Sequence, residues 1–379
     1  MRKEEFLTAL RAGLTGLSPE GVEKLVEFCS EMIDDRMEDG LTEEEAVAAA
    51  GSLNELIQQA KTELLPVKAA NFTEKSTFGD TLCTYTAESS ICGVAADCGP
   101  ADFQILPSEN NICRVEYTEN ETVRYAVTTE NNVLHICRAD SRTMFSFFKF
   151  YRAQRSEPVR VYLPQGAYKS LEVKATSGDI AVPAGYIFDT ASLHGISGDI
   201  ACCAACGSLS AHTASGDIAL KNAKCNAAEL CAASGDATLE NVKLGKNSCI
   251  ETASGKVQIT NLEAAELNVE TASGKVSLEN AECAALHINT ASGGVELTHT
   301  VSADVMKIGT ASGSIRLENC DAASLALDSM SGSVVGTLNT GKAFRAKSRS
   351  GKIDIPFDSG TGTCKVSTLS GSIRIKIAK

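Results

Sequence analysis

A Ser-Gly pair recurs eleven times in the second half of this chain of 379 residues, once every 18 to 20 residues. A fixed period of this length is typical of repeat proteins, in which each repeat buries its apolar face against the next one. The region is therefore expected to fold as a stack of similar units. The pairs begin at Ser177, Ser197, Ser215, Ser234, Ser254, Ser273, Ser292, Ser312, Ser331, Ser350 and Ser370.

The residues beside each pair alternate between two kinds of side chain. In Leu267-x-Val269-x-Thr271, just before Ser273, every second residue is apolar or carries a small hydroxyl. Alternation with a period of two indicates a strand with one buried face. The glycine that follows the serine marks a bend between two strand segments.

A second corner is indicated seven residues after the serine, where asparagine recurs. Asparagine tolerates a left-handed backbone, which tight corners often need. The positions are Asn222, Asn241, Asn261, Asn280 and Asn319. A threonine two residues before the serine recurs in the same way, so stacking would align a hydroxyl ladder of Thr213, Thr252, Thr271, Thr290 and Thr310.

Two or three short strands and as many corners in each repeat predict one coil of a single-stranded parallel β-helix, also called a β-solenoid. At a spacing of about 4.8 Å, eleven coils would extend about 50 Å. Left-handed hexapeptide helices need six-residue units that the sequence lacks, so we favour a right-handed helix, with a β-roll-like solenoid as the alternative. A leucine-rich repeat is disfavoured, because the coils lack its LxxLxL core and a helical segment.

Residues 1–65 differ from the repeats and predict a small α-helical domain. Phe6, Leu10 and Leu14 recur at helical spacing, and the segment holds 15 acidic residues against 6 basic ones. This acidic head is a candidate docking module for a protein partner. We expect a linker over 66–77, an irregular β part that caps the solenoid over 78–165, and the repeat β-helix over 166–379.

Two stretches of the chain resemble known families. The head, with "KEEFLTALRAGLTGLSP" and "EMIDDRMEDGLTEEEAV", resembles the HAAS-type helical domain of bacterial membrane and signalling proteins. The repeats, with "ATSGDIAV" and "TASGKVSL", resemble the bacterial putative-adhesin family of Ser-Gly-Asp repeat β-helices. The second resemblance implies a β-solenoid fold and a role in adhesion at the cell surface.

Charge and hydropathy exclude several classes of protein. A net charge of −13 argues against a nucleic-acid binder, which needs clustered Lys and Arg. No apolar run reaches the 18 residues that a membrane span requires, and the opening is not a secretory signal. We therefore expect a cytoplasmic protein, with a cell-surface or membrane-peripheral location as the alternative.

Two sets of residues are candidate metal sites. Asp179, Asp199, Asp217 and Asp236 follow Ser-Gly in the first four repeats and would form a ladder able to hold Ca²⁺. Later repeats place Lys, Gly or Ser there, so a solvated structural corner is preferred. The Cys202-Cys203-x-x-Cys206 cluster holds one CxxC and lacks a second pair, which favours packing over zinc binding.

The chain carries no motif of a catalytic site. The five histidines are scattered, with no paired ligand spacing, and there is no phosphate-binding loop or nucleophile elbow. We therefore expect no catalytic residues, no cofactor and no metal.

A basic and aromatic segment stands before the repeats. It is a candidate patch for a protein partner or a membrane surface, or else a hairpin that folds over the solenoid. Its residues are Phe145, Phe147, Phe148, Lys149, Phe150, Tyr151 and Arg152.

Together these features predict a non-enzymatic binding or scaffold protein, an adhesin-like solenoid whose helical head docks a partner. The final "SIRIKIAK" has no evident cap. An uncapped end is a candidate surface for end-to-end stacking into homo-oligomers. One alternative is a bacterial signalling or envelope-stress component. Another is a β-helix enzyme that acts on polysaccharide, which would need an aromatic-lined groove with clustered carboxylates.

Overall fold

The structure is a computed structural model that describes residues 3–14, 26, 30, 33, 42, 43, 81–120, 123–139, 157–357 and 360–378. The chain divides into two compact units, the first made of 1–79, 120–123 and 140–154, and the second of the remainder. The linker predicted over 66–77 lies outside the described residues. In the described part of the chain, no helix is both long and apolar enough to cross a membrane.

The described part of the first unit begins with helix α1 (Lys3–Gly13). Glu4 and Glu5 occupy its first turn, where negative charge interacts favourably with the helix dipole. Phe6 and Leu10 lie one turn apart and are buried, so α1 is amphipathic as predicted. The other predicted helices of the head fall mostly outside the described residues.

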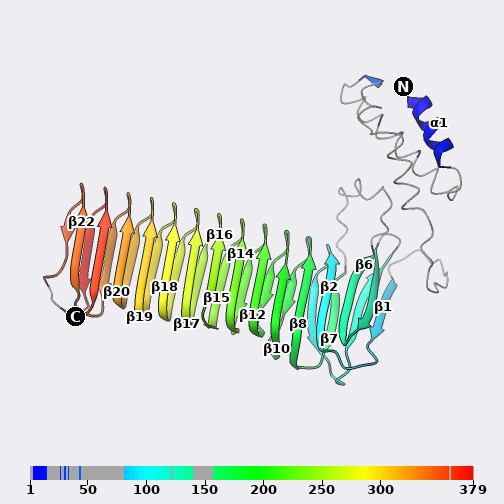
Figure 1. Cartoon of the computed structure of the whole chain (residues 1–379), viewed down its shortest axis with the longest axis horizontal. Helices are drawn as coiled ribbons and strands as arrows, with labels where there is room; N and C mark the ends of the chain where they lie inside the picture. The colour runs from blue at the N-terminus through cyan, green and yellow to red at the C-terminus, as the bar shows by residue number, and fades with distance from the viewer. Residues whose placement is uncertain are drawn as a thin grey trace. The chain divides into compact units, whose positions relative to one another are not determined.

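The second unit is the predicted β-solenoid, and it has about ten turns where the repeats predict eleven coils. Successive strands stack in parallel, and Figure 1 shows them side by side along this unit, with short turns projecting at one edge. The first coils contain β8 (Gly166–Ala175), β9 (Ile180–Val182), β10 (Tyr186–His194), β11 (Ile200–Cys202), β12 (Ala205–Thr213), β13 (Ile218–Lys221), β14 (Lys224–Ala232), β15 (Ala237–Leu244) and β16 (Ser248–Thr252).

The middle coils are the most regular, because one strand runs through each coil from one Ser-Gly turn to the next. These strands are β17 (Val257–Thr271), β18 (Val276–Thr290), β19 (Val295–Thr310) and β20 (Ile315–Ser329). Their inward residues form aliphatic ladders, such as Val257, Val276 and Val295, which are all fully buried. Burial of each such side chain contributes about 1.5–3 kcal/mol.

Antiparallel pairs occur before the regular coils. β4 pairs in this way with β1 and β7, and β5 pairs in this way with β6, while β2 and β3 join the parallel ladders of the solenoid. The strands are β1 (Thr81–Thr86), β2 (Gly93–Gly99), β3 (Phe103–Pro107), β4 (Arg114–Glu119), β5 (Arg124–Glu130), β6 (Val133–Ala139) and β7 (Val159–Leu163).

The Ser-Gly corner is held by the threonine ladder. Thr271 is buried, and its hydroxyl accepts a hydrogen bond of 2.9 Å from the Gly274 amide. Thr310 does the same for Gly313 and also donates to the Gly293 carbonyl of the preceding coil at 3.2 Å. The hydroxyl ladder predicted from the sequence therefore satisfies backbone groups within and between coils.

The Asn corner is left-handed, as predicted. Asn222, Asn241, Asn261, Asn280 and Asn319 have φ values between 52° and 56°. The side-chain amide of each of Asn241, Asn261 and Asn280 donates to the side-chain oxygen of the asparagine one coil earlier, at 2.8 to 3.2 Å. The asparagines thus link the coils as well as turning the chain.

The last coils are stacked out of chain order. They contain β21 (Val334–Leu338), β22 (Ala343–Ser348), β23 (Ile353–Asp354), β24 (Thr363–Thr368) and β25 (Ile373–Ile377). β24 lies between β20 and β22, and β25 lies between β21 and β23. The final segment is therefore paired on both sides, contrary to the expectation that it forms the open end.

The outermost strand at this end is β22, and its exposed side chains include Arg345 and Lys347. Basic residues on an edge strand oppose pairing with a second copy of the same edge. Association through this end stays a prediction, and light scattering over a range of concentrations would test it.

Candidate functional site

A groove of about 1640 Å³ runs along the solenoid beside the projecting turns. Each middle coil adds the three residues that precede its Ser-Gly pair, such as Glu270, Thr271 and Ala272. The first of the three points outward, the second is the buried threonine of the hydroxyl ladder, and the third is exposed. The groove therefore crosses many coils and is built from rigid, hydrogen-bonded strands.

Small side chains line the groove throughout its middle. Alanine precedes the serine at 214, 233, 253, 272, 291 and 311. Because the threonine hydroxyls already bind backbone groups, the alanine methyl groups offer a ligand an apolar surface. A row of methyl groups lets another backbone approach closely.

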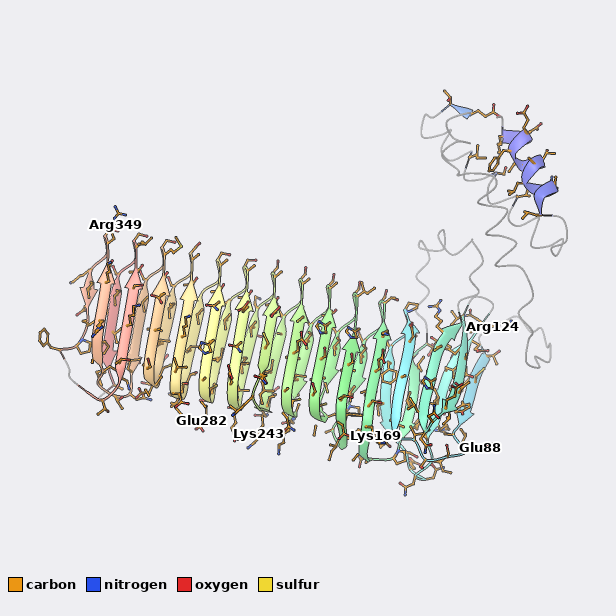
Figure 2. All side chains as sticks on the ribbon, viewed as in Figure 1. Glu88, Arg124, Lys169, Lys243, Glu282 and Arg349 are labelled. Atoms are coloured by element: carbon orange, nitrogen blue, oxygen red, sulfur yellow. The ribbon has the colours of Figure 1, made fainter. Side chains whose placement is uncertain are left out.

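The charge of the groove changes along its length. Glu251 and Glu270 line the middle, whereas Lys347 and Arg349 line the end formed by β22 and the turn after it. Figure 2 shows Arg349 on the edge with the projecting turns, while Lys243 and Glu282 lie on the opposite edge. The groove thus presents an acidic section followed by a basic one.

Two histidines lie together near the other end of the groove. The rings of His194 on β10 and His212 on β12 stack, with centroids 5.2 Å apart and planes 13° apart. Ser192 and Ser210 contact the Nε2 atoms of the same two rings at 2.9 Å and 2.7 Å. Burial, and then the neighbouring His212 and Lys174 charges, lower the pKa of His194.

His212 also lies beside Glu229 and Cys231 on the next strand, β14. In the register of β12 and β14, His212 is opposite Cys231 and Ser210 is opposite Glu229. One ligand atom from each of His212, Glu229 and Cys231 lies within 4.8 Å of the other two. Among the residues that the structure describes, no other group of three or more His, Cys, Asp or Glu side chains converges in this way.

The electrostatics of Cys231 favour its protonated form. Burial is the main cause that raises the pKa of this thiol, followed by the carboxylates of Glu251 and Glu229. The next cysteine along the same face, Cys249, contacts Glu251 Oε1 through Sγ at 3.4 Å. Burial and this Glu251 contact raise the pKa of Cys249 to about 12.

The aspartate ladder binds backbone amides. The carboxylate Oδ1 of Asp179 accepts a hydrogen bond from the Asp199 amide at 2.8 Å, and Asp199 and Asp217 bind the next rungs in the same way. Asp102 adds a rung before the first one, and Asp236 binds the Lys256 amide after the last. The ladder thus links coils through hydrogen bonds, which the sequence pattern did not reveal.

The buried cysteines occupy small apolar positions, as predicted. Cys206, Cys225 and Cys283 are 4%, 1% and 6% exposed. Cys206 lies within hydrogen-bonding reach of the thiols of Cys202 and Cys225, and these contacts together with burial raise its pKa. All fourteen cysteines that the structure describes are free thiols.

Not every candidate from the sequence can be placed. The aromatic segment from Phe145 to Arg152 lies outside the described residues. Motifs along the chain do not reveal the histidine cluster, because its members come from different coils. Alignment of the repeats on Ser-Gly places His194, His212, Cys231 and Glu251 at the same offset, three residues before the serine, and so predicts that they are neighbours.

Two family profiles match the chain. The profile of the family described as Toastrack DUF4097 matches residues 97–298 and 299–379, which include the solenoid and its groove. The chain belongs to the Toastrack DUF4097 family. The HAAS profile matches residues 5–59, so the resemblance of the helical head is confirmed.

Several solved structures are similar to this chain. A putative adhesin from Bacteroides fragilis is 11% identical, with a TM-score of 0.34, and the match covers 78% of this chain and 97% of that one. A putative cell adhesion protein from Clostridium sporogenes is 11% identical with a TM-score of 0.20, covering 79% of this chain and 100% of that one. A putative adhesin from Parabacteroides merdae is 11% identical with a TM-score of 0.23, covering 79% and 96%. No curated protein matches the chain.

Proposed function

We propose that this Toastrack protein is a non-enzymatic binding scaffold whose groove holds an extended segment of a partner protein. The observation that carries the proposal is the continuous groove, which crosses the coils from Gly195 to Leu369. Its walls are strands fixed by backbone ladders, so little conformational entropy is lost on the scaffold side when a ligand binds.

The lining of the groove favours an extended polypeptide. The exposed alanines, such as Ala253 and Ala272, leave room for a backbone, and a lining repeated from coil to coil suits an extended chain. The acidic section at Glu251 and Glu270 would attract basic side chains of the partner. The basic section at Lys347 and Arg349 would attract acidic ones, which sets the direction of the bound segment.

The helical head supplies a second binding module in the proposal. The head matches the HAAS profile and carries a net charge of −9 over residues 1–65, from 15 acidic and 6 basic residues. A charged module of this kind suits a partner with a basic surface, because opposite charges steer the encounter. We propose that the head recruits one protein while the groove holds another.

The test compares three full-length proteins as baits in cell lysate, with chemical crosslinking and quantitative mass spectrometry. The groove variant carries Ala253→Arg, Ala272→Arg and Ala291→Arg, three exposed positions whose long side chains would fill the groove. The control variant carries Gln258→Arg, Ser277→Arg and Ser314→Arg, which add the same charge away from the groove.

We expect at least one protein to be captured by the wild type and the control, and to be at least tenfold depleted with the groove variant. Crosslinks from that protein should map to the groove. Equal capture by the groove variant would overturn the groove as the binding surface. Turnover of a polysaccharide by the wild-type protein would contradict the non-enzymatic part of the proposal.

A further inference from the structure

The side chains that converge near the N-terminal end of the groove differ in chemistry from the rest of its lining. His212, Glu229 and Cys231 offer one nitrogen, one oxygen and one sulfur ligand atom within 4.8 Å of one another. His212 and Cys231 also line the groove, whereas Glu229 lies two register pairs away, opposite Ser210. The three side chains come from two neighbouring strands and share the outward face.

We propose that His212, Glu229 and Cys231 form a binding site for a zinc ion.

Zinc is favoured by the kind and number of these ligand atoms. Imidazole nitrogen, thiolate sulfur and carboxylate oxygen are the three groups that bind Zn²⁺ in proteins, at about 2.0–2.3 Å. A thiolate ligand disfavours Mg²⁺ and Ca²⁺, which prefer oxygen ligands. Ligand atoms around a tetrahedral zinc ion are about 3.5 Å apart, so small side-chain rotations close the observed spacing.

The surroundings of the three side chains hold them in position. Ser210 Oγ lies 2.7 Å from His212 Nε2. The His194 ring stacks on the His212 ring, with the two centroids 5.2 Å apart. Contacts of this kind orient a histidine ligand and strengthen metal binding. The strands themselves are fixed by a parallel register of eight paired residues between β12 and β14, so the site is built on rigid elements.

The charge near the site suits a divalent cation. Glu229 belongs to the site, and Glu251 on β16 is paired in register with Cys231. Binding of Zn²⁺ replaces the proton on Cys231, which leaves to solvent as the sulfur–zinc bond forms. Three protein ligands leave one tetrahedral position open, and a group of a ligand in the groove could occupy it.

The experiment uses the full chain, reduced and freed of metal, and titrates it with Co²⁺ as a spectroscopic substitute for zinc. We expect a thiolate-to-cobalt charge-transfer band that saturates and that one equivalent of Zn²⁺ removes. Cys231→Ser should abolish the band, and His212→Ala should weaken Zn²⁺ binding at least tenfold. Cys249→Ser is the matched control. Cys249 lies on β16, is paired in register with Glu229 of β14, and is not one of the three ligands.

Circular dichroism would establish that each variant keeps its β-structure. The proposal is overturned if the wild type shows no charge-transfer band, or if Cys231→Ser keeps the full band. It is also overturned if Cys249→Ser removes the band as completely as Cys231→Ser does. Loss of the band in Cys231→Ser alone, with full binding in Cys249→Ser, is the result that supports it.

Discussion

The two corners of each coil turn the chain by different physical means. At the Asn corner the backbone itself is left-handed, and Asn241 and Asn280, for example, both have a φ of 54°. At the Ser-Gly corner the backbone is ordinary, since the described glycines with positive φ are Gly99, Gly166, Gly185 and Gly362, none of which follows a repeat serine. Glycine is needed at this corner for a different reason.

That reason is the close approach of neighbouring coils. A Cβ atom added at Gly274 would lie closer than 3.0 Å to the carbonyl oxygen of Gly255, which belongs to the preceding coil. The same holds for every glycine of a Ser-Gly pair from Gly198 to Gly371. Each would meet the carbonyl of the corresponding glycine in a neighbouring coil. One corner therefore constrains the conformation of a residue, and the other constrains the space between coils.

The difference explains how strictly each corner is kept in the sequence. Glycine follows the serine in all eleven repeats, because any side chain there would push two backbones apart. Asparagine is kept in five, and His299 takes its place in one coil with a φ of 48°. Strain in one residue's φ is tolerated more readily than a clash between two backbones.

The largest effect is expected from Gly274→Ala. The new methyl group meets the Gly255 carbonyl and the Thr271 hydroxyl, and rigid strands on both sides prevent relaxation. We expect a loss of about 4 kcal/mol or more in the free energy of unfolding, measured by urea denaturation with circular dichroism.

Gly294→Ala is the matched control, because it lies next to a repeat glycine in the same turn. A Cβ atom there would meet only the Ser314 carbonyl, at an ordinary 3.6 Å. We expect a change within about 0.5 kcal/mol. If Gly274→Ala were as mild as this control, close approach could not be the reason for the glycine.

Much of this architecture could be predicted from the sequence, because each coil repeats the same local solution. The alternation around Ser273, the left-handed asparagines and the threonine ladder all follow from residue chemistry at a fixed period. The order of the last coils could not be predicted. The serines at 331, 350 and 370 are spaced 19 and 20 residues apart, and this spacing suits sequential stacking as well as the exchanged order observed.

The candidate site was harder to predict for a related reason. Its members, His212, Glu229 and Cys231, do not form a motif along the chain. His212 becomes a neighbour of the other two only through the register of β12 and β14. Likewise, the groove arises from stacking many copies of a short segment, none of which resembles a binding motif. The binding proposed for this surface depends on which residues are adjacent across coils.

The second effect in size is expected from Thr271→Val, which keeps the shape of the side chain and removes its hydroxyl. The Gly274 amide, which donates to this hydroxyl at 2.9 Å, would be left buried without a partner. A buried unsatisfied donor costs about 1–3 kcal/mol. Hydrogen exchange at the Gly274 amide and urea denaturation would measure the loss, and Thr260→Val, at a half-buried position on another side of the coil, should change stability far less. Unchanged protection of Gly274 in Thr271→Val would contradict the ladder's role.

A smaller effect is expected at the Asn corner. Asn261→Ala forces alanine into a φ of 56° and removes two side-chain hydrogen bonds, for an expected loss of about 1–2 kcal/mol. Asn261→Gly removes the same bonds without the strain, so the difference between the two variants isolates the conformational part. Equal losses from the two, in urea denaturation, would show that φ is not what selects asparagine here.

The smallest effect is expected from Asp199→Asn in the aspartate ladder beside the Ser-Gly corner. An asparagine can still accept the hydrogen bond from the Asp217 amide, and the ladder loses one of its stacked negative charges. We expect a change within about 0.5 kcal/mol, whereas Asp199→Ala, which removes the acceptor, should cost about 1 kcal/mol.

The same pair of variants separates a hydrogen-bonded ladder from a cation ladder. If the carboxylates serve the backbone amides, Ca²⁺ should leave the melting temperature of the wild type unchanged, and Asp199→Asn should melt with it. If they hold a cation, Ca²⁺ should raise the melting temperature of the wild type, and both variants should lose that rise because both remove a charge. The first outcome would make the aspartates equivalent to the Asn ladder at the opposite corner. Both ladders would then join coils through hydrogen bonds donated by amide groups. The second would mean that the two corners differ in chemistry as well as in geometry.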